Sequence, residues 1–359
     1  MSSNPAGDTT PVVPEVPAAA EAPAVPAAPA AALPTAQPAP LVADDADSAY
    51  DGNSLDGSDT TSLRSSIYNY RVENGRTYHA YKEGEYWGPN DEQAQDNMDI
   101  GNHLYTLLLR GKIFKAPIEK APRRVLDIGT GTGIWAIDFA DQYPSAEVIG
   151  VDLSPIQPAF VPPNCKFEVD DIAENWTWKP ESFDYIHIRA MYGSIADWPK
   201  LYKQAYDHLA PGGFIEHMEV DCEIASDDNT VPEDHPFWRW TKVFLQFGKL
   251  SGKSFIQARD AKNMITAAGF ENVDEEILKM PIRAWSTDPH LKKVGMWQQL
   301  FAETGVEGHG LAILTRVLGW TYAEAELLIN EVRNAIKDPK THAYYRCNIV
   351  VAQKPLSSA

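Results

Sequence analysis

Residues 124–136, which read RVLDIGTGTGIWA, constrain the fold of this chain more than any other stretch. A short apolar run typical of a buried strand comes first, and apolar residues at helical spacing follow. Between them stand Gly129, Gly131 and Gly133, at every second position. A strand that turns tightly into a helix needs residues that tolerate positive φ and let a ligand approach the backbone. Asp127 ends the strand, so the stretch predicts a ligand site that carries a carboxylate.

A second acid follows the glycine turn at the spacing expected for a ribose contact. Residues 147–152 read EVIGVD and predict the next strand, which ends in Asp152. An acid roughly 20 residues past a glycine turn suits a ribose, because a carboxylate can accept hydrogen bonds from both hydroxyls. The two acids together predict a nucleoside-containing cofactor above the carboxyl ends of a parallel sheet.

Glycine spacing alone does not identify that nucleoside. Gly131, Gly133 and Ala136 also match the dinucleotide fingerprint G-x-G-x-x-A. A dinucleotide places its pyrophosphate close to this turn, where the carboxylate of Asp127 would repel it. S-adenosylmethionine carries a sulfonium and an ammonium, which both favour a nearby carboxylate. The acid therefore favours a methyltransferase over a dehydrogenase.

Strands and helices alternate after the turn, at a spacing typical of βαβ units. Further strands are predicted at 166–170, 183–189 and 214–220, and Asp197 caps a predicted helix that ends at Leu209. This pattern indicates an α/β, Rossmann-like fold with helices on both faces of a parallel sheet.

The C-terminal part adds a helical insert and two more strands. Residues 273–282 and 346–352 are predicted strands, and 288–338 predict helices between them. A final strand after a long insert suggests a seventh strand that pairs antiparallel beside the fifth. The aromatic helix expected over 235–252 is interpreted as packing, with an apolar substrate wall as the alternative.

Composition divides the chain into two parts. Residues 1–62 are rich in Ala and Pro, with nine acids and no Lys or Arg, and predict a disordered acidic tail. Residues 63–355 are the expected catalytic domain, comprising an N-terminal lid (63–120), a cofactor-binding core (121–222), and the insert with its closing strands (223–355). In the lid, Tyr78 or His79 would contact the cofactor; alternatively the lid aromatics simply cover a sheet edge.

Net charge and cysteine usage exclude several classes. The formal net charge is −19, and the remainder after residue 62 still holds 31 basic against 41 acidic residues, which argues against direct nucleic-acid binding. Three widely spaced cysteines form no Cys-x-x-Cys pair, so we expect neither a disulfide framework nor a structural metal. No apolar run approaches the roughly 18 residues of a membrane span. We expect the cytoplasm or the nucleus.

Other candidate residues stand at or near strand ends. Asp171, followed by Ile172, is expected to accept from the adenine amino group. Tyr192 borders the crevice where a methyl group would be transferred, and His217 lies near it on the fifth strand. Tyr192 and His217 are weak catalytic candidates, since methyl transfer needs a general base only for a weak nucleophile. A structural role for His217 is the alternative.

The motifs in order resemble those of class I S-adenosylmethionine-dependent methyltransferases. The matching pieces are VLDIGTGTG from Val125, the acid Asp152, Asp171 with Ile172, and LAPGG from Leu209. The resemblance implies a seven-stranded sheet and S-adenosylmethionine as cofactor. The sequence has no Cys-x-x-Cys or His-rich site, so we expect a metal-independent reaction. Together with the positions at the lid and the strand ends, the residues expected to bind the cofactor are Asp127, Gly129, Thr130, Gly131, Gly133, Asp152, Leu153, Asp171, Ile172, Arg189 and Tyr78.

A narrower resemblance covers nearly everything from Tyr68 onward. ENGRTYH from Glu73, GIWAI from Gly133 and VDLSPIQP from Val151 resemble the fungal LaeA-like methyltransferases. That family includes a global regulator of secondary metabolism that works with velvet-domain proteins in the nucleus, and many paralogues. The tail differs from that regulator's leader, which favours a paralogue. The resemblance implies a role in regulating secondary metabolism or development; the alternatives are a metabolite-modifying enzyme of a gene cluster and a cofactor-binding regulatory subunit. The methyl acceptor, protein or small molecule, stays open.

Overall fold

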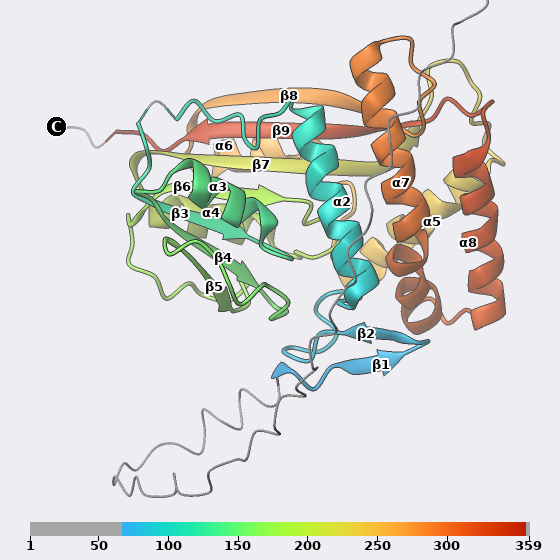
Figure 1. The fold of residues 1–359 in the computed structure, drawn as a ribbon, viewed down its shortest axis with the longest axis horizontal. Coiled ribbons are helices and arrows are strands. Elements are labelled where there is room, and N and C mark those ends of the chain that lie inside the picture. Colours follow the sequence, from blue (N-terminus) through green and yellow to red (C-terminus); the bar gives the residue numbers. More distant parts are fainter. Residues whose placement is uncertain (1–66, 119, 357–359) are drawn as a thin grey trace, which may run out of the picture. The chain divides into compact units, whose positions relative to one another are not determined.

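The computed structural model describes residues 67–118 and 120–356, and a seven-stranded sheet lies at its centre (Figure 1). The strand order is β5-β4-β3-β6-β7-β9-β8. The strands are β3 (Arg124–Ile128), β4 (Glu147–Asp152), β5 (Cys165–Val169), β6 (Phe183–Arg189), β7 (Leu209–Ala225), β8 (Glu271–Pro281) and β9 (Tyr344–Gln353). The strands from β5 to β7 are parallel, whereas β9 pairs antiparallel with both β7 and β8. The predicted antiparallel strand beside the fifth is therefore confirmed.

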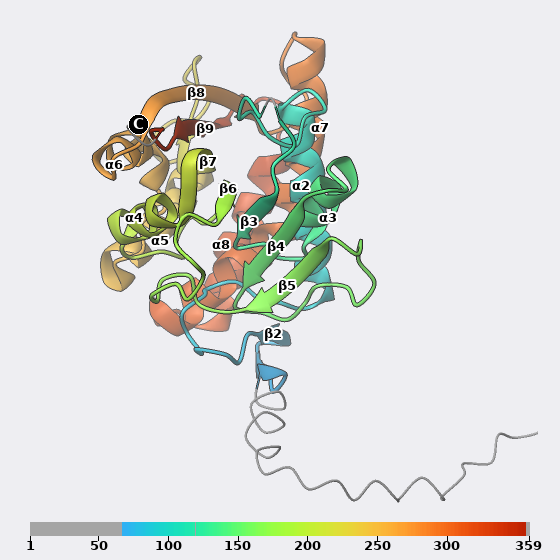
Figure 2. The ribbon, with the colours of Figure 1, turned by 90° about the vertical axis from the view of Figure 1, so that its left-hand side faces the viewer.

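Helices cover both faces of this sheet (Figure 2). They are α2 (Glu92–Leu108), α3 (Ile134–Gln142), α4 (Trp198–His208), α5 (Pro236–Ser251), α6 (Ala261–Ala267), α7 (Pro289–Ala312) and α8 (Tyr322–Lys337). Because successive strand residues point to opposite faces, Leu126 joins the core beneath α4 and α6, while its neighbour Val125 packs beneath α3. Both layers are apolar, as expected for a parallel sheet that is buried on each side.

Two elements differ from the sequence prediction. β7 begins at Leu209 and not at residue 214, because Leu209 already pairs with Phe183 before the register shifts at the glycines that follow. The sequence also predicts a helix from Ala258 to Ala268, stopped by Gly269; the structure instead has a short 3-10 turn, η1 (Gln257–Arg259), followed by α6. Both misses are boundary errors of the kind that tertiary pairing decides and local sequence does not.

The N-terminal part forms a small hairpin and one long helix. β1 (Arg71–Glu73) and β2 (Arg76–Tyr78) pair antiparallel around Asn74 and Gly75, whose φ angles are 51° and 77°. Two positive φ angles at the turn match the twist that joins tight hairpins. Asp91 caps α2 by accepting a hydrogen bond from the backbone N–H of Ala94. The expected tail, 1–62, lies outside the described residues, and the division into lid, core and insert stays a prediction.

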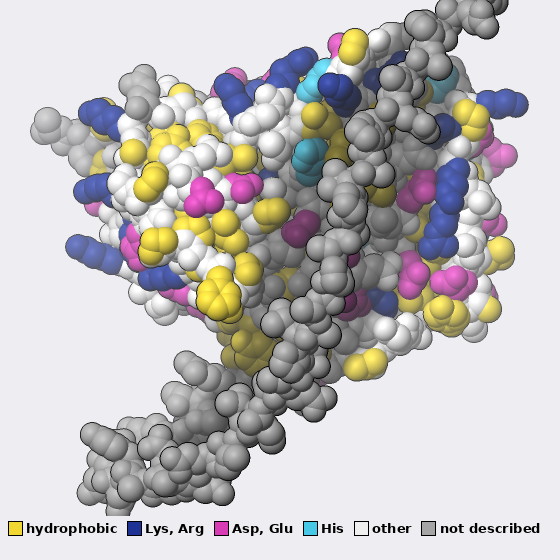
Figure 3. All heavy atoms as spheres, in the orientation of Figure 1, with side chains coloured by type: hydrophobic (Ala, Val, Ile, Leu, Met, Phe, Trp, Pro, Cys, Tyr) yellow, Lys and Arg dark blue, Asp and Glu magenta, His cyan; other side chains and the backbone are white. Residues whose placement is uncertain are grey.

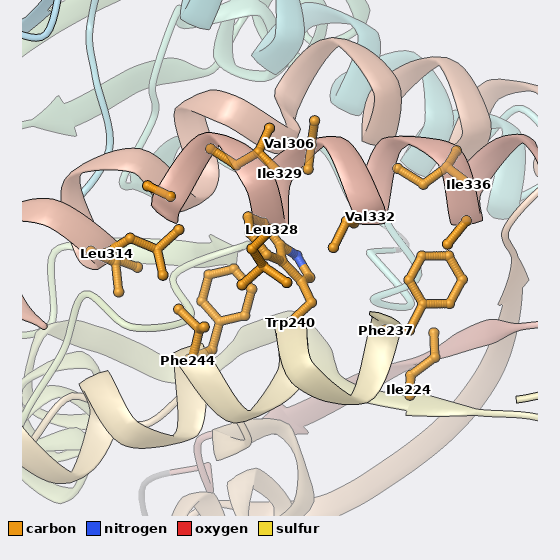
Figure 4. Close-up of a cluster of buried hydrophobic side chains, with 14 of the residues drawn as sticks. Ile224, Phe237, Trp240, Phe244, Val306, Leu314, Leu328, Ile329, Val332 and Ile336 are labelled. Carbon is orange, nitrogen blue, oxygen red and sulfur yellow. The ribbon is translucent and has the colours of Figure 1, made fainter. Parts of the chain in front are cut away.

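The insert carries its own hydrophobic core (Figure 4). Aromatic side chains of α5 interlock with aliphatic side chains of α8 and with the end of α7. Phe237, Trp240, Phe244 and Phe247 are all buried there, which confirms the packing interpretation of this helix. None of the four lines the cavity at the carboxyl ends of β3, β4 and β6 that is described below, so these aromatic side chains form no substrate wall there.

Charged side chains of both signs are interspersed on the face shown in Figure 3. Among residues 67–118 and 120–356, no helix is long and apolar enough to cross a membrane. Within the same ranges no group of three or more His, Cys, Asp or Glu side chains is arranged to hold a metal ion.

Candidate functional site

A cavity of about 410 Å³ opens at the carboxyl ends of β3, β4 and β6. Its walls come from the loops that follow these strands and β5, the segment that precedes α2, one face of α2, one face of α7, the start of α4, and Lys253. Parallel strands place their carboxyl ends at one edge of a sheet, which is where ligands of open α/β folds bind. The cavity is therefore the candidate active site.

The glycine turn forms one wall of the cavity, and its three glycines serve different purposes. Their φ angles are 68°, 57° and 81° at Gly129, Gly131 and Gly133, all in the left-handed region. A side chain at Gly129 would overlap Met191, and one at Gly133 would overlap Phe167. Gly131 instead has only Met98 near, with 3.3 Å to its sulfur. Gly129 and Gly131 line the cavity, and Gly131 presents its backbone with the most room for a ligand.

Asp152 connects the second strand to this turn. Its carboxylate oxygens accept hydrogen bonds from the backbone N–H groups of Gly131 and Ser154, each at 2.9 Å. Burial raises the pKa of Asp152 to about 6, against the opposing effect of these two hydrogen bonds. Asp152 and Leu153 line the cavity, where the expected ribose contact stays a prediction.

Asp127 lies in the cavity wall with both oxygens already occupied. His187 Nδ1 lies 2.7 Å from one oxygen, and Thr130 Oγ1 donates to the other at 2.6 Å. Burial lowers the pKa of His187, so the neutral ring donates its Nδ1 proton to the carboxylate. The indole of Trp135 stacks on that ring at 3.7 Å between centroids. Asp127 therefore stabilises the glycine turn through its hydrogen bond with Thr130. Its direct contact with the cofactor stays a prediction.

His187 is a cavity residue that the sequence analysis missed. Asp127 and His187 are direct partners in the register of β3 and β6. The sequence analysis predicted both strands but neither their pairing nor their register.

Arg189 ends β6 and joins the sheet to α2. Its Nη2 donates to Asn102 Oδ1 at 2.7 Å, and its guanidinium lies over the ring of Tyr105 at 5.0 Å. Burial lowers its pKa below the ordinary arginine value. Arg189 lines the cavity, as expected for a residue at the end of the fourth strand.

Asp171 and Ile172 also line the cavity, next to a lysine of the lid. Lys82 Nζ lies 2.9 Å from Asp171 Oδ2, and the backbone N–H of Ala173 donates to Oδ1 at 2.9 Å. An adenine amino group would share this carboxylate with Lys82. The expected adenine contact stays a prediction, and the structure adds the lysine as a competitor for it.

Tyr78 and Gly133 do not line the cavity, which corrects two expectations. Tyr78 is 1% exposed and packs under the guanidinium of Arg316, which lies 4.5 Å from its ring centroid. Gly133 is the N-cap residue of α3. The lid contributes Tyr86 and Trp87 to the cavity wall in place of Tyr78.

The two weak catalytic candidates, Tyr192 and His217, lie in different environments. Tyr192 lines the cavity, and its ring stacks on Trp87 at 6.1 Å between centroids. His217 does not line it: the side chain is fully buried, its Nδ1 lies 2.9 Å from the Tyr202 hydroxyl, and its ring packs on Trp198. The structural alternative therefore fits His217, which lies outside the cavity wall.

Comparison with known proteins identifies the family. A family model described as a methyltransferase domain matches residues 101–275. The chain is 39% identical over 307 residues to "Methyltransferase pytC" of Aspergillus terreus, which covers 85% of this chain and 94% of that protein. It is 39% identical over 290 residues to "Secondary metabolism regulator LAE1" of Cochliobolus heterostrophus, with 79% and 94% covered. The chain belongs to the LaeA-like family of fungal methyltransferases.

Another relative of this LaeA-like methyltransferase is "Protein-methionine methyltransferase laeA" of Emericella nidulans, 36% identical over 290 residues, with 80% and 77% covered. The cofactor is S-adenosylmethionine. The residues at the turn fit it, because Gly131 leaves space that a side chain would fill and Asp152 brings a carboxylate to the edge of that space. The Rossmann-like class I fold expected from the sequence is confirmed.

Proposed function

We propose that this LaeA-like methyltransferase transfers the methyl group of S-adenosylmethionine to an acceptor that enters the same cavity from the side of the lid and α7. One observation carries the proposal: a single cavity is lined by the glycine turn and Asp152 and also by the lid and α7. Two reactants bound in one enclosed space meet with little further loss of freedom. Gly131 and Asp152 would hold the cofactor, which supplies an activated methyl group when bound.

The lid would keep water from this reaction. Lys253 Nζ lies 2.6 Å from a carboxylate oxygen of Glu85, and Lys82 is paired with Asp171. The indole N–H of Trp87 donates to the backbone oxygen of Tyr192 at 3.2 Å. These contacts tie the segment before α2 to both sides of the cavity, which favours a closed and dry site.

The process that this reaction serves is suggested by the relatives. The names of LAE1 and laeA point to regulation of secondary metabolism, so we place the methyltransferase there, with velvet-type or other regulatory proteins as partners and with the nucleus or cytoplasm as its location. The second candidate is a metabolite-modifying enzyme, which the similarity to pytC favours. Removing residues 1–62 should impair the regulatory role alone and leave methyl transfer intact.

Calorimetric titration of the full chain with S-adenosylmethionine, and separately with NAD, tests the proposal. We expect saturable binding of the first alone, and its loss when Gly131→Ala is combined with Asp152→Ala. Gly252→Ala is the matched control, because Gly252 has a comparable φ of 74° at the end of α5 but does not line the cavity. Tight binding of NAD, or equal binding by the double variant, would contradict the proposal.

A further inference from the structure

We propose that His309 and Trp87 form the acceptor subsite, and that this subsite takes a flat, unsaturated small molecule bearing a hydroxyl or carbonyl group. The inference rests on the proposed function and names the class of its acceptor. It concerns the part of the cavity that lies away from the glycine turn, where the lid meets α7.

One face of α7 forms this wall. Its cavity-lining residues are spaced at i, i+3, i+4, i+7 and i+8, which places them on a single helical face; they are Phe301, Thr304, Gly305, Gly308 and His309. A side chain at Gly305 would overlap Asn97, and one at Gly308 would lie 3.3 Å from Arg76 and Pro89. The two glycines therefore let α2 and the lid pack directly on the backbone of α7.

Most polar groups of this wall are already paired. Thr304 Oγ1 donates to the backbone oxygen of Leu300 at 2.8 Å and accepts from Asn97 Nδ2 at 2.8 Å. Arg76 donates two hydrogen bonds to Asp91, at 2.6 and 2.8 Å. The wall thus offers a carboxylate ligand no uncompensated positive charge, which favours a neutral acceptor over an anionic one.

His309 also lines the cavity, and none of the described residues hydrogen-bonds its ring. Among the cavity-lining residues, Arg76 Nη1 and Asn90 Nδ2 are likewise buried without a hydrogen-bond partner. Burial lowers the pKa of His309 to about 4, so the ring is neutral near physiological pH, with one nitrogen that donates and one that accepts. Polar groups of this kind are normally paired in folded proteins, with water or a ligand if not with the chain. A hydroxyl or carbonyl of an acceptor would satisfy it.

Aromatic rings frame this imidazole. The ring centroids of Trp87 and Phe301 lie 5.9 and 5.3 Å from that of His309. On its other side Trp87 stacks on Tyr192, which belongs to the loop after β6 beside the glycine turn. Aromatic faces stabilise flat unsaturated ligands by stacking. A row of rings thus runs from the imidazole toward the place where the methyl group would be held.

The lid segment that covers these rings favours a small molecule over a protein segment as the acceptor. Trp87 is 6% exposed and belongs to the lid that Lys253 and Lys82 tie down on opposite sides. A folded protein that offered a side chain would have to displace this segment, whereas a small flat molecule fits beneath it. The geometry therefore points to a ring-bearing metabolite.

Binding of naphthol and naphthalene to the full-length protein, saturated with S-adenosylhomocysteine, tests the inference by fluorescence titration. We expect naphthol to bind saturably, and His309→Leu to weaken it about tenfold, the effect of one lost hydrogen bond on a neutral group. His309→Gln, which retains a donor and an acceptor, should recover part of the affinity. Naphthalene, which lacks the hydroxyl, should bind the wild type and His309→Leu about equally.

His103→Leu is the matched control. His103 also packs on a tryptophan, 4.0 Å from Trp297 between centroids, but it is exposed on α2 and does not line the cavity. It should leave naphthol binding unchanged. Equal naphthol binding by His309→Leu and wild type, or no binding by wild type, would overturn the inference. Calorimetry with S-adenosylhomocysteine on the same samples separates this outcome from failure of the proposed function, which would abolish that binding too.

Discussion

Protonation of Asp152 should control cofactor binding. Its carboxylate accepts from the backbone N–H groups of Gly131 and Ser154 in the cavity wall. Burial raises its pKa to about 6, because removing the carboxylate from water disfavours its charged form. Only the ionised carboxylate can accept hydrogen bonds from both ribose hydroxyls while keeping these backbone bonds. The affinity for S-adenosylhomocysteine should therefore fall as the pH drops through about 6.

The size of this effect follows from the pKa of Asp152. With a pKa of about 6, the ionised fraction falls from about nine-tenths at pH 7 to about one-tenth at pH 5, which weakens binding about tenfold. An aspartate with the ordinary pKa of about 3.9 would stay more than about nine-tenths ionised at pH 5. His309, with a pKa of about 4, stays largely neutral over this interval. Burial also lowers the pKa of His187, which favours the neutral form of that ring.

Calorimetry between about pH 5 and pH 7 measures this dependence, and the amino group of the ligand stays protonated over that interval. Binding near pH 6 should also release a fraction of a proton, seen as a dependence of the heat on the buffer. Asp152→Asn should bind more weakly at pH 7 and show no dependence on pH. An affinity that is constant for the wild type, or a decline that persists in Asp152→Asn, would refute the reasoning.

Three further predictions concern stability, each measured by urea unfolding. Gly310→Ala should lower the unfolding free energy by about 1–3 kcal/mol, because the added methyl would overlap Trp240. Arg76→Met should cost about 3 kcal/mol by leaving Asp91 without its buried partner; unchanged unfolding would contradict this. Burial raises the pKa of Glu216 to about 7, so its contribution falls by up to about 3 kcal/mol as the pH rises from about 4.5 to 7, and Glu216→Gln should remove this decline.

The cofactor half of the cavity could be predicted from the sequence because its signals are local. Gly129 and Gly131 need positive φ within a few residues of a strand, and Asp152 stands at the end of the next strand. Strand pairing brings these pieces together without any long-range contact between side chains. For the same reason the antiparallel β9 was predictable from the insert that precedes it.

The acceptor half was not predictable, because it depends on contacts between distant segments. Asn97 Nδ2 on α2 donates to the backbone oxygen of Phe301 at 2.8 Å, across more than half of the chain. Nothing near residue 301 in the sequence indicates that partner. From the sequence, Gly308 and Gly310 are expected as breaks between helices, but the helix continues through both. Gly305 and Gly308 lie inside this one helix. Their spacing of three residues was the available signal for a close helix contact.

Tyr78 shows why closeness in sequence to cavity-lining residues does not predict a contact with the cavity. It stands two residues after Arg76 in a short strand, so both side chains point to the same side. That side faces α7 and the π-helical turn η2 (Ile313–Val317) that follows it, where Arg316 pairs with Glu73 and covers the tyrosine ring. The hairpin is thus anchored to the insert, and the cavity contacts of the lid come from the segment after it.

Backbone atoms define the cofactor half of the cavity, whereas side chains define the acceptor half, and this difference affects specificity. At the cofactor half, backbone conformation and backbone N–H groups define the surface, so most substitutions there deform the turn itself. At the acceptor half, side chains such as His309 and Trp87 define the surface, and they project from a helix and a lid that other contacts hold in place. Substitutions at these two positions can therefore change which acceptor binds while the affinity for S-adenosylmethionine stays constant. Under the proposed acceptor subsite, the lid and the insert together, and not the glycine turn, would determine what is methylated.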